Sequence, residues 1–351
     1  RKRPLLLRSL GVEDREPAAG RHNEVKENVP VVTTIMGKGA VPTTHPLYIG
    51  NCGMHGKYAA NMAVMECDLL FSIGTRFNDR ITGDLNEFAP HAQIVHIDVD
   101  TASISRNVVV DVPVVADAGV ALEKLLEWAE KKDTAKWQEQ IHRWEKENPL
   151  AMRRDRGISP QMIMEHINAQ FPHSIYVTDV GQHQMWATQY LELDEQSQLI
   201  TSGGLGTMGF GFPAAIGAKI ANPKKPVVCI TGDGGFQMNI QEMATASENQ
   251  LDVKIILMNN EALGLVHQQQ SLFYEQGVFA ATYPGKINFM QIAAGFGLET
   301  CDLNNEADPQ AALQEIINRP GPALIHVRID AEEKVYPMVP PGAANTEMVG
   351  E

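Results

Sequence analysis

Asp233 and Asn260 are the side chains whose types and spacing point most directly to chemistry. Asp233 lies in the turn Gly232-Asp233-Gly234-Gly235, Asn260 ends the pair Asn259-Asn260, and each segment follows an apolar run. Residues recur at helical spacing between them, which predicts a strand, a turn, a helix and a second strand. A right-handed crossover makes the strands parallel and brings both residues to one sheet edge. Carboxylate and amide oxygens there suit Mg²⁺, and the glycines let backbone N–H groups approach a diphosphate.

A Gly-Asp-Gly turn alone has a simpler explanation. It is more often part of an ordinary strand–helix–strand unit than of a metal site. The correctly spaced Asn-Asn pair, with predicted strands on both sides, reverses that preference.

Two further segments can reach the same site. Gly181-Gln182-His183 follows the apolar strand predicted at 176–180, where Gly181 permits a tight turn and the next two side chains can bond phosphate oxygens. Five glycines lie between residues 203 and 211, directly before a predicted helix. Such a loop allows very close approach of the backbone to a ligand.

Composition predicts a globular chain with two domains. The chain has 351 residues, 44% of them hydrophobic and 21% charged, and its net charge of −14 argues against a nucleic-acid partner. No apolar run approaches a membrane span, and the first 30 residues lack the core of a signal peptide. The four dispersed cysteines predict reduced, mostly buried thiols and a cytoplasmic location.

The predicted fold class is α/β, with two doubly wound parallel-sheet domains. Within the opening segment, residues 3–7 read as a buried strand, whereas 8–28 lack apolar periodicity and are expected to be disordered or locally misassembled. A chain that begins in mid-strand also suggests a missing upstream part. The expected organisation is an irregular remnant at 1–30, a first domain at 31–128, a linker helix at 129–157, a second domain at 158–330 and a C-terminal arm or lid at 331–351.

The first domain has the pattern of a nucleotide-binding sheet. Gly74-Thr75-Arg76 ends one predicted strand, and Asp98 and Asp117 end the next two. An arginine there can meet a pyrophosphate and an aspartate can bond a ribose hydroxyl. A dinucleotide dehydrogenase is the rival reading, but no G-x-G-x-x-G fingerprint follows a strand.

The Gly-Asp-Gly turn with its paired asparagines resembles the signature of thiamine diphosphate (ThDP) enzymes. The resemblance makes Asp233 and Asn260 side-chain ligands of Mg²⁺, with the backbone carbonyl of Ala262 as the third ligand. It assigns the Gly206 carbonyl to the 4′-amino group of the cofactor and makes Met208 the wedge that bends ThDP. The implied ThDP-binding residues are Val180, Gly181, Gln182, His183, Gly206, Met208, Asp233, Gly234, Gly235, Asn260, Ala262, Gly264 and Leu265.

The segments 181–186, 206–211, 260–274 and 323–329, taken together, resemble the catalytic subunit of acetolactate synthase (acetohydroxyacid synthase). The match runs from about residue 31 to the C-terminus. It implies an FAD-binding middle domain in which FAD is mainly structural. The implied FAD-binding residues are His55, Gly56, Gly74, Thr75, Arg76, Asp98 and Asp117. One departure bears on FAD affinity, because Arg8-Ser9-Leu10 stands where the family has a glycine-rich turn.

The resemblance implies a transferase that condenses two pyruvates to 2-acetolactate and CO₂, or pyruvate and 2-oxobutyrate to 2-aceto-2-hydroxybutyrate, on the route to valine, leucine and isoleucine. It implies a homodimer or tetramer with a small regulatory subunit. The family's catalytic glutamate lies in an N-terminal domain that this sequence does not contain, so the chain alone is expected to be inactive.

The expected catalytic pocket residues are Met208, Val266 and Gln269. Most relatives have Trp at the position of Gln269, so weak discrimination between pyruvate and 2-oxobutyrate as acceptors is expected.

Two alternatives to this function remain open. Another ThDP enzyme, such as a pyruvate oxidase or a glyoxylate carboligase, would share the fold. A non-catalytic nucleotide-binding or subunit-interaction module would share the sheet pattern without binding ThDP and Mg²⁺.

Overall fold

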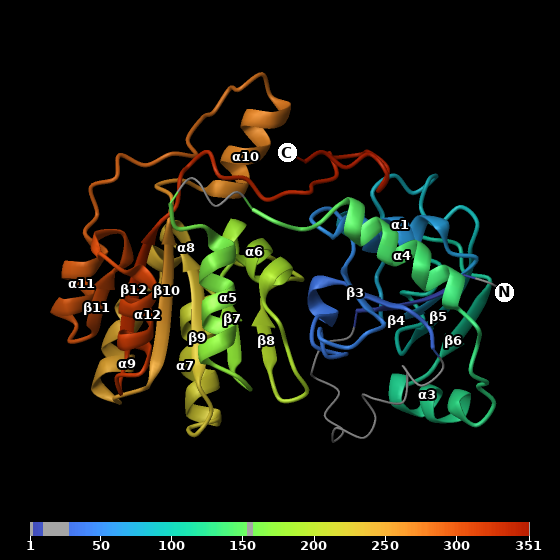
Figure 1. Cartoon of the computed structure of the whole chain (residues 1–351), viewed down its shortest axis with the longest axis horizontal. Helices are drawn as coiled ribbons and strands as arrows, with labels where there is room; N and C mark the ends of the chain where they lie inside the picture. Colours follow the sequence, from blue (N-terminus) through green and yellow to red (C-terminus); the bar gives the residue numbers. More distant parts are fainter. Residues whose placement is uncertain (1–2, 10–27, 153–156, 351) are drawn as a thin grey trace. The chain divides into compact units, whose positions relative to one another are not determined.

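A computed structural model of the chain describes residues 3–9, 28–152 and 157–350. They form two compact units, each built around a six-stranded parallel sheet with helices between the strands (Figure 1). The first unit comprises Arg1–Leu150, Glu192–Glu195 and Tyr336–Glu351, and the second comprises Ala151–Leu191 and Gln196–Val335. The predicted α/β class with two parallel sheets is confirmed.

The first sheet has the strand order of dinucleotide-binding domains, β3-β2-β1-β4-β5-β6. Its direction of progression reverses between β1 and β4, so a crevice for ligands is expected beyond the carboxyl ends of these two strands. The strands are β1 (Pro4–Arg8), β2 (Val31–Thr33), β3 (Tyr48–Asn51), β4 (Leu69–Ile73), β5 (Gln93–Asp98) and β6 (Val112–Val115).

Strand β1 agrees with the buried strand predicted at residues 3–7, so the irregular remnant expected at 1–30 does not include these residues. This strand pairs in parallel with both β2 and β4 and is buried along its whole length. A strand covered on both faces needs a continuous apolar run, which Leu5–Leu7 supplies. Arg8 ends the strand and the Ser9 N–H donates to the Ile73 carbonyl, so these two residues are also ordered. Residues 10–27 of the segment expected to be irregular lie outside the described residues.

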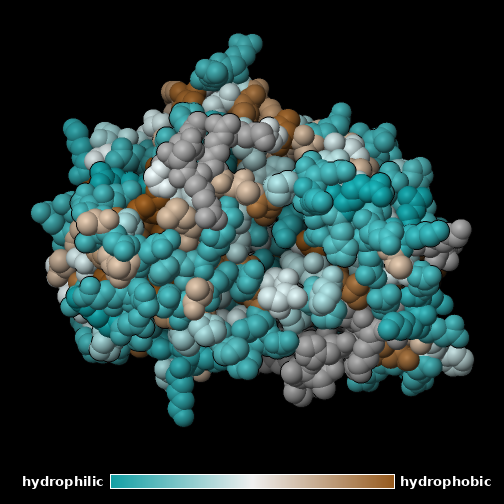
Figure 2. Space-filling view, in the orientation of Figure 1, coloured by the Kyte–Doolittle hydropathy of each residue, from teal (hydrophilic) through white to brown (hydrophobic). Residues whose placement is uncertain are grey.

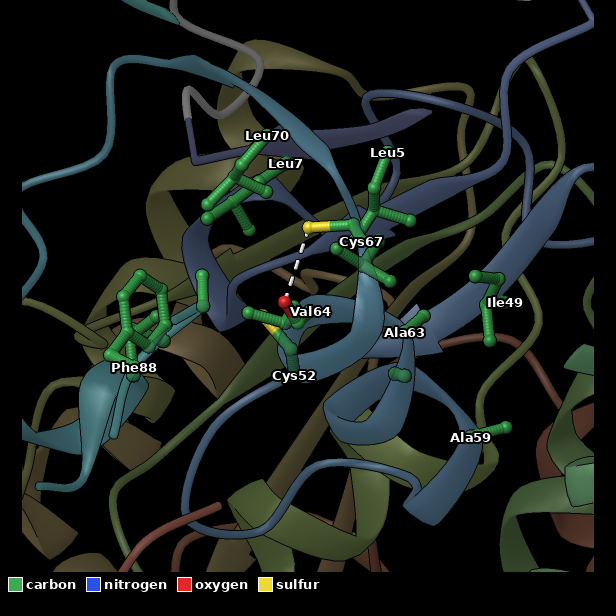
Figure 3. Packing of buried hydrophobic residues seen from close by; sticks show 14 of the residues in the cluster. Leu5, Leu7, Ile49, Cys52, Ala59, Ala63, Val64, Cys67, Leu70 and Phe88 are labelled. Atoms are coloured by element: carbon green, nitrogen blue, oxygen red, sulfur yellow. Dashed lines mark hydrogen bonds between the residues drawn. The ribbon is translucent and has the colours of Figure 1, made fainter. Parts of the chain in front are cut away.

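Small side chains let helix α1 (Tyr58–Glu66) lie close to the first sheet. Ala59, Ala60 and Ala63 are buried on it. Figure 3 shows this core, in which the Cys67 thiol donates a hydrogen bond to the Val64 carbonyl (3.2 Å). The other α-helices of this unit are α2 (Asp79–Thr82), α3 (Ala118–Leu126) and α4 (Ala135–Glu147).

Helix α4 is the helix predicted as a linker, and it packs into the core of the first unit. Trp137 and Ile141 are buried in that core, and the Trp137 indole N–H donates to the Pro4 carbonyl (3.2 Å). The helical spacing of its apolar residues is therefore explained by packing within the first unit rather than by a free linker.

The second sheet has the strand order β11-β12-β10-β9-β7-β8. The direction of progression reverses between β7 and β9, which again places a ligand crevice at their carboxyl ends. The strands are β7 (Ile175–Thr178), β8 (Gln198–Thr201), β9 (Val227–Gly232), β10 (Val253–Asn259), β11 (Glu299–Asp302) and β12 (Ala323–Arg328).

The α-helices of the second unit alternate with its strands and cover a core rich in Val, Ile and Phe. Sequence signals fix several of their starts: Ser159 and Asp308 accept capping hydrogen bonds, and each is followed by a proline at the first helical position. The helices are α5 (Pro160–Gln170), α6 (Gln182–Tyr190), α7 (Gly211–Ala221), α8 (Asp233–Met238), α9 (Met243–Glu248), α10 (Gly264–Phe273), α11 (Phe289–Gly295) and α12 (Pro309–Ile317).

The C-terminal segment, which was predicted to be an arm or lid, belongs from Tyr336 onward to the first unit. Met338 and Val339 are buried in the first unit, and the Val339 N–H donates to the Met54 carbonyl (2.8 Å). Met338 and Val349 form an antiparallel bridge. Burial of these apolar side chains holds the segment against the first unit.

The thiols agree with the sequence prediction. All four cysteines are free; Cys52, Cys67 and Cys229 are buried and Cys301 is half-buried. Within the described ranges, no helix combines the length and apolar character needed to cross a membrane.

Candidate functional site

A cavity of about 250 Å³ lies at the carboxyl ends of β7, β9 and β10 in the second unit. All thirteen residues predicted to contact ThDP line it, together with Val266. Other lining residues that sequence reasoning did not select are Trp186, Gly232, Met258, Leu263 and Ile329. The predicted site residues, taken from four separate stretches of sequence, therefore meet around one concave space.

Asp233 begins helix α8 directly after β9 and is only 3% exposed. The Gly234 N–H donates to its Oδ1 (2.9 Å). Burial raises the pKa of Asp233 to about 6, because the charged form loses water, although backbone hydrogen bonds oppose that shift. A cation at this carboxylate would stabilise the ionised form and compensate for its burial.

Asn260 directly follows β10, and its amide has a defined orientation. Its Nδ2 donates to Gln182 Oε1 (3.0 Å), and its Oδ1 accepts from the Ala262 N–H (3.2 Å). Glu261 adopts a positive φ of 56°, which turns the chain between the two residues. The turn is held by hydrogen bonds from the Leu263 N–H to Ala281 and from the Tyr283 N–H to Glu261.

The donor set at this wall of the cavity suits a hard cation. Residues 3–9, 28–152 and 157–350 contain no group of three or more His, Cys, Asp or Glu side chains that could hold a metal. The predicted ligands are instead one carboxylate, one amide oxygen and one backbone carbonyl, from Asp233, Asn260 and Ala262. Mg²⁺ binds few protein oxygens and keeps its remaining positions for water and phosphate, so these residues fit it.

His183 lines the cavity and has one buried nitrogen without a hydrogen bond in the described part of the chain. Its ring is buried and its Nε2 has no hydrogen-bond partner among the described residues. Burial lowers the pKa of His183 to about 4, against the opposing charge of Asp179, so the imidazole is neutral near pH 7. A buried nitrogen without a partner is costly, and a polar ligand in the cavity would remove that cost.

Glycines form a cradle around the cavity because a side chain would not fit. A Cβ at Gly234 would lie 2.5 Å from the Tyr283 hydroxyl, and one at Gly264 would overlap Gln182 Oε1. A Cβ at Gly181 or Gly232 would lie 2.7 or 2.8 Å from the ring of His183. Polar side chains and backbone can therefore approach one another, and a ligand, closely at the start of α8 and α10.

Sequence reasoning missed Asp179, which shapes the glycine-rich loop. Asp179 is 1% exposed, and its carboxylate accepts from the N–H groups of Val180 (2.7 Å), Gly209 (3.0 Å) and Gly211 (3.0 Å). The rule that selected Asp233, an acidic residue at the carboxyl end of a predicted strand, would also have selected Asp179.

Tyr283 is a second residue near the site that the sequence did not predict. Its hydroxyl lies against Gly234 at the start of α8. Burial raises the pKa of Tyr283, and the negative charge of Asp233 acts in the same direction. No local sequence signal marked this residue, because it comes from a loop fifty positions after Asp233.

Comparison with known protein families agrees with this geometry. Residues 179–327 match the C-terminal, TPP-binding domain of thiamine pyrophosphate enzymes, and residues 2–125 match their central domain. Thiamine pyrophosphate is another name for ThDP. The chain belongs to the thiamine pyrophosphate enzyme family.

Named relatives within this family are large subunits of acetolactate synthase. The chain is 58% identical over 354 residues to the isozyme 1 large subunit of Escherichia coli (strain K12), covering 100% of this chain and 62% of that protein. It is 43% identical over 331 residues to the large subunit of Cyanidium caldarium, covering 92% and 56%. It is 41% identical over 327 residues to the isozyme 2 large subunit of Escherichia coli (strain K12), covering 92% and 58%. The predicted resemblance is confirmed, and the chain spans roughly three fifths of the length of these relatives.

Gln182 lines the cavity, but its side-chain donors point elsewhere. Its Nε2 donates to Gln268 Oε1 (3.0 Å) and to the Glu333 carbonyl (2.9 Å). Its predicted contact with phosphate therefore has to come from its backbone N–H and stays a prediction.

Two residues predicted for the acceptor pocket, Val266 and Gln269, lie on α10 but differ in their position relative to the cavity. Val266 lines the cavity and is 45% exposed, whereas Gln269 is half-buried and is not part of the lining. Exposed Tyr274 and Phe279 follow on the same segment. The face in Figure 2 shows apolar surface over the α10 region, at the top of the view. A role for Gln269 in acceptor choice stays a prediction.

The predicted FAD residues lie at carboxyl ends of strands in the first unit. Gly74, Thr75 and Arg76 follow β4, at the reversal point of the sheet, and the buried Thr75 Oγ1 has no hydrogen-bond partner among the described residues. This hydroxyl and the exposed Arg76 suit a pyrophosphate group.

The remaining predicted FAD residues have local structural explanations. Asp98 accepts from the Asp100 N–H (2.8 Å), and Asp117 caps α3 by accepting from the Val120 N–H (3.1 Å). His55 and Gly56 follow β3, and a Cβ at Gly56 would lie 2.7 Å from the Asn51 carbonyl oxygen. Their contacts with FAD stay predictions.

Proposed function

We propose that this chain is the part of an acetolactate synthase large subunit that binds ThDP through Mg²⁺. The reaction is the condensation of two pyruvates to 2-acetolactate and CO₂, or of pyruvate with 2-oxobutyrate to 2-aceto-2-hydroxybutyrate, for branched-chain amino acid synthesis. The observation that carries the proposal is the cavity at the sheet reversal point, lined by every residue predicted to contact ThDP. The names of the relatives favour acetolactate synthase over a pyruvate oxidase or a glyoxylate carboligase.

Five residues that line the cavity have a defined task in this proposal. Asp233, Asn260 and the Ala262 carbonyl hold Mg²⁺, and the backbone N–H groups at the start of α8 receive the diphosphate, where the helix dipole favours negative charge. Neutral His183 donates to or accepts from a polar group of the ligand through Nε2. Met208 would pack against the bound cofactor as the wedge that the resemblance implies. When bound, ThDP supplies the carbanion chemistry needed to decarboxylate a 2-oxo acid.

The proposal includes further partners. We propose FAD as a mainly structural group in the first unit, held near Gly74, Thr75 and Arg76. The words "large subunit" in the names of the relatives support a small regulatory subunit as a partner. A homodimer or tetramer and a cytoplasmic location complete the proposal, as expected from the sequence.

The chain alone is proposed to bind ThDP without turning over pyruvate. Among the described residues that line the cavity, Asp233 is the only carboxylate, and its proposed task is to bind the metal. The family resemblance assigns the proton transfer at the pyrimidine to a glutamate, and the described lining of the cavity supplies no second carboxylate for that task. Acetolactate formation by the purified chain, free of host enzyme, would contradict this part of the proposal.

Calorimetric titration of the 351-residue chain with ThDP tests the binding proposal. Heat of binding is expected with Mg²⁺ present and is expected to disappear when EDTA removes the metal. An absence of binding in both conditions contradicts the proposal and favours a non-catalytic module. Equal binding in both conditions contradicts the metal-bridged mode.

A further inference from the structure

The side-chain amides of Asn260, Gln182 and Gln268 form a row of hydrogen bonds that leads from the cavity wall into the interior of the second unit. Asn260 Nδ2 donates to Gln182 Oε1 (3.0 Å), and Gln182 Nε2 donates to Gln268 Oε1 (3.0 Å). Gln268 is fully buried, and Gln182 is 4% exposed. With little or no water to satisfy them, these amides depend on one another for hydrogen bonds.

The backbone of Val335 fixes the far end of this row. The Val335 N–H donates to Gln268 Oε1 (2.8 Å), and Gln268 Nε2 donates to the Val335 carbonyl (3.0 Å). A primary amide has an oxygen at one end and an NH₂ group at the other, and only one orientation satisfies both bonds. Gln268 Oε1 therefore has to face the Val335 N–H and cannot exchange places with Nε2.

This fixed orientation passes along the row. Gln268 Oε1 and the Glu333 carbonyl are both acceptors, so Gln182 turns its Nε2 toward them. Gln182 Oε1 then faces Asn260, which can meet it only with its NH₂ group. As a result the Asn260 Oδ1 is left for the Ala262 N–H and the cavity.

Gly264 makes this close approach possible. A Cβ at this position would overlap Gln182 Oε1 and would lie 2.7 Å from Asn260 Nδ2. The first residue of α10 thus leaves space for the Asn260–Gln182 bond, while Gln268 sits one helical turn further along the same helix.

We propose that Gln268 is a positioning residue that, through Gln182, holds Asn260 with its carbonyl oxygen toward the metal. The inference rests on the proposed Mg²⁺–ThDP function. Mg²⁺ binds the amide oxygen and not the NH₂ group. If the Asn260 amide flips, the metal loses one ligand and meets two N–H donors instead. The row removes that flipped state before the metal arrives. Such partners of metal ligands typically change metal affinity by about 10–100-fold when they are lost.

A purely structural role for Gln268 predicts a different pattern. If Gln268 only anchors residues 333–335, its loss lowers thermal stability but leaves the metal dependence of binding unchanged. Gln270 supplies a matched control on the same helix. It makes the same two-way pair with the backbone of Phe279 (3.1 and 3.0 Å) and has no bond to the Asn260 row.

The test measures the Mg²⁺ dependence of ThDP binding by calorimetry on the whole chain, with the melting temperature of the metal-free protein recorded in parallel. Gln268→Met keeps the side-chain length and removes both hydrogen-bonding groups. We expect it to lower the apparent Mg²⁺ affinity by about 10-fold or more, whereas Gln270→Met leaves that affinity unchanged. Gln268→Glu, which when buried in its protonated form accepts from Gln182 and the Val335 N–H and donates its O–H to the Val335 carbonyl, should restore most of the affinity. Gln268→Asn, too short to reach Gln182, replaces Gln268→Met if the latter does not fold.

A double-mutant comparison assigns the effect to Asn260. In an Asn260→Ala background no amide remains to orient, so Gln268→Met should cause no further loss of Mg²⁺ affinity. An equal loss in both backgrounds, or a Gln268→Met protein that binds Mg²⁺ and ThDP as Gln270→Met does, overturns the proposal. Failure of the unaltered chain to bind ThDP with Mg²⁺ would instead contradict the proposed function.

Discussion

Asp179 and Gly209 join the end of strand β7 to the glycine-rich loop, through a hydrogen bond of 3.0 Å from the Gly209 N–H to Asp179 Oδ1. The other carboxylate oxygen accepts from the Gly211 N–H at the same distance. A loop with so many glycines has a high conformational entropy when free. One buried carboxylate that accepts from two of its backbone groups therefore helps to fix the shape of the loop that lines the cavity.

Asp179→Asn should destabilise the second unit. Asparagine has one acceptor oxygen, and its NH₂ group would face a backbone N–H, so one buried donor loses its partner at a cost of about 1–3 kcal/mol. Urea unfolding measures this loss. Asp308→Asn is the control, because asparagine caps a helix such as α12 about as well as aspartate and should be nearly neutral. Equal stability of the two variants would contradict the role of Asp179.

Asp233 and Asn260 should differ in their effect on metal binding. Asp233→Ala removes the only formal negative charge among the predicted ligands and should abolish Mg²⁺-dependent ThDP binding. Asn260→Ala removes a neutral ligand and should weaken it less. Calorimetric titration of both variants compares them, and an unchanged ThDP affinity in Asp233→Ala would contradict the metal assignment.

Lys38 should make the stability of the first unit depend on pH. Its side chain is 4% exposed, and its pKa is lowered to about 7, first by burial and second by the charge of Lys57, with Glu192 opposing. The unfolded chain therefore binds more protons than the folded one between about pH 7 and pH 10.5. Lys38 therefore lowers the unfolding free energy. This loss is complete below about pH 7 and disappears as the pH rises toward 10.5, the pKa of lysine in the unfolded chain.

Lys38→Met removes this loss, so its gain in unfolding free energy over the unaltered chain should be largest near pH 7 and should shrink toward pH 10. Urea unfolding at several pH values measures the gain. Lys131 is exposed, so Lys131→Met is the control. Its difference in unfolding free energy from the unaltered chain should not change with pH. If the gain from Lys38→Met does not change with pH, the pKa of Lys38 is not lowered in the folded protein.

Gln269 should reduce acceptor discrimination in the catalytically competent assembly. A Trp at this position offers a broad apolar face for the extra methyl group of 2-oxobutyrate, and burial of such a group is worth roughly 1–3 kcal/mol, or about 10–200-fold in preference. Gln269 offers less apolar surface, so weak preference is expected, together with lower sensitivity to inhibitors that stack on a Trp. Competition between pyruvate and 2-oxobutyrate, in the unaltered assembly and in Gln269→Trp, measures this. Equal product ratios from the two would refute it.

The sequence predicted those parts of the site that depend on local order. Asp233 and Asn260 each follow a strand and belong to one strand–helix–strand unit, so their meeting follows from the crossover rule. The single helix predicted between them was wrong in detail. Asn239 adopts φ −134° and divides that stretch into α8, a 3-10 turn at Ile240–Glu242 and α9.

The missed features depend on partners that are distant in the sequence. Gln268, for example, meets Val335 across sixty-seven positions. Periodicity within one segment contains no information on such pairings. The same reason explains why the C-terminal segment was predicted as an arm, although Met338 and Val339 bury themselves in the first unit.

Diffraction from crystals of the chain grown with ThDP and Mn²⁺, a spectroscopically distinct substitute for Mg²⁺, would test the metal site most directly. Anomalous scattering locates the ion without reference to the surrounding chain. We expect a single strong peak within bonding distance of Asp233 Oδ, Asn260 Oδ1 and the Ala262 carbonyl oxygen, next to the diphosphate. A peak elsewhere, or ThDP bound without an ion at these three oxygens, would contradict the assignment of this cavity as a Mg²⁺–ThDP site.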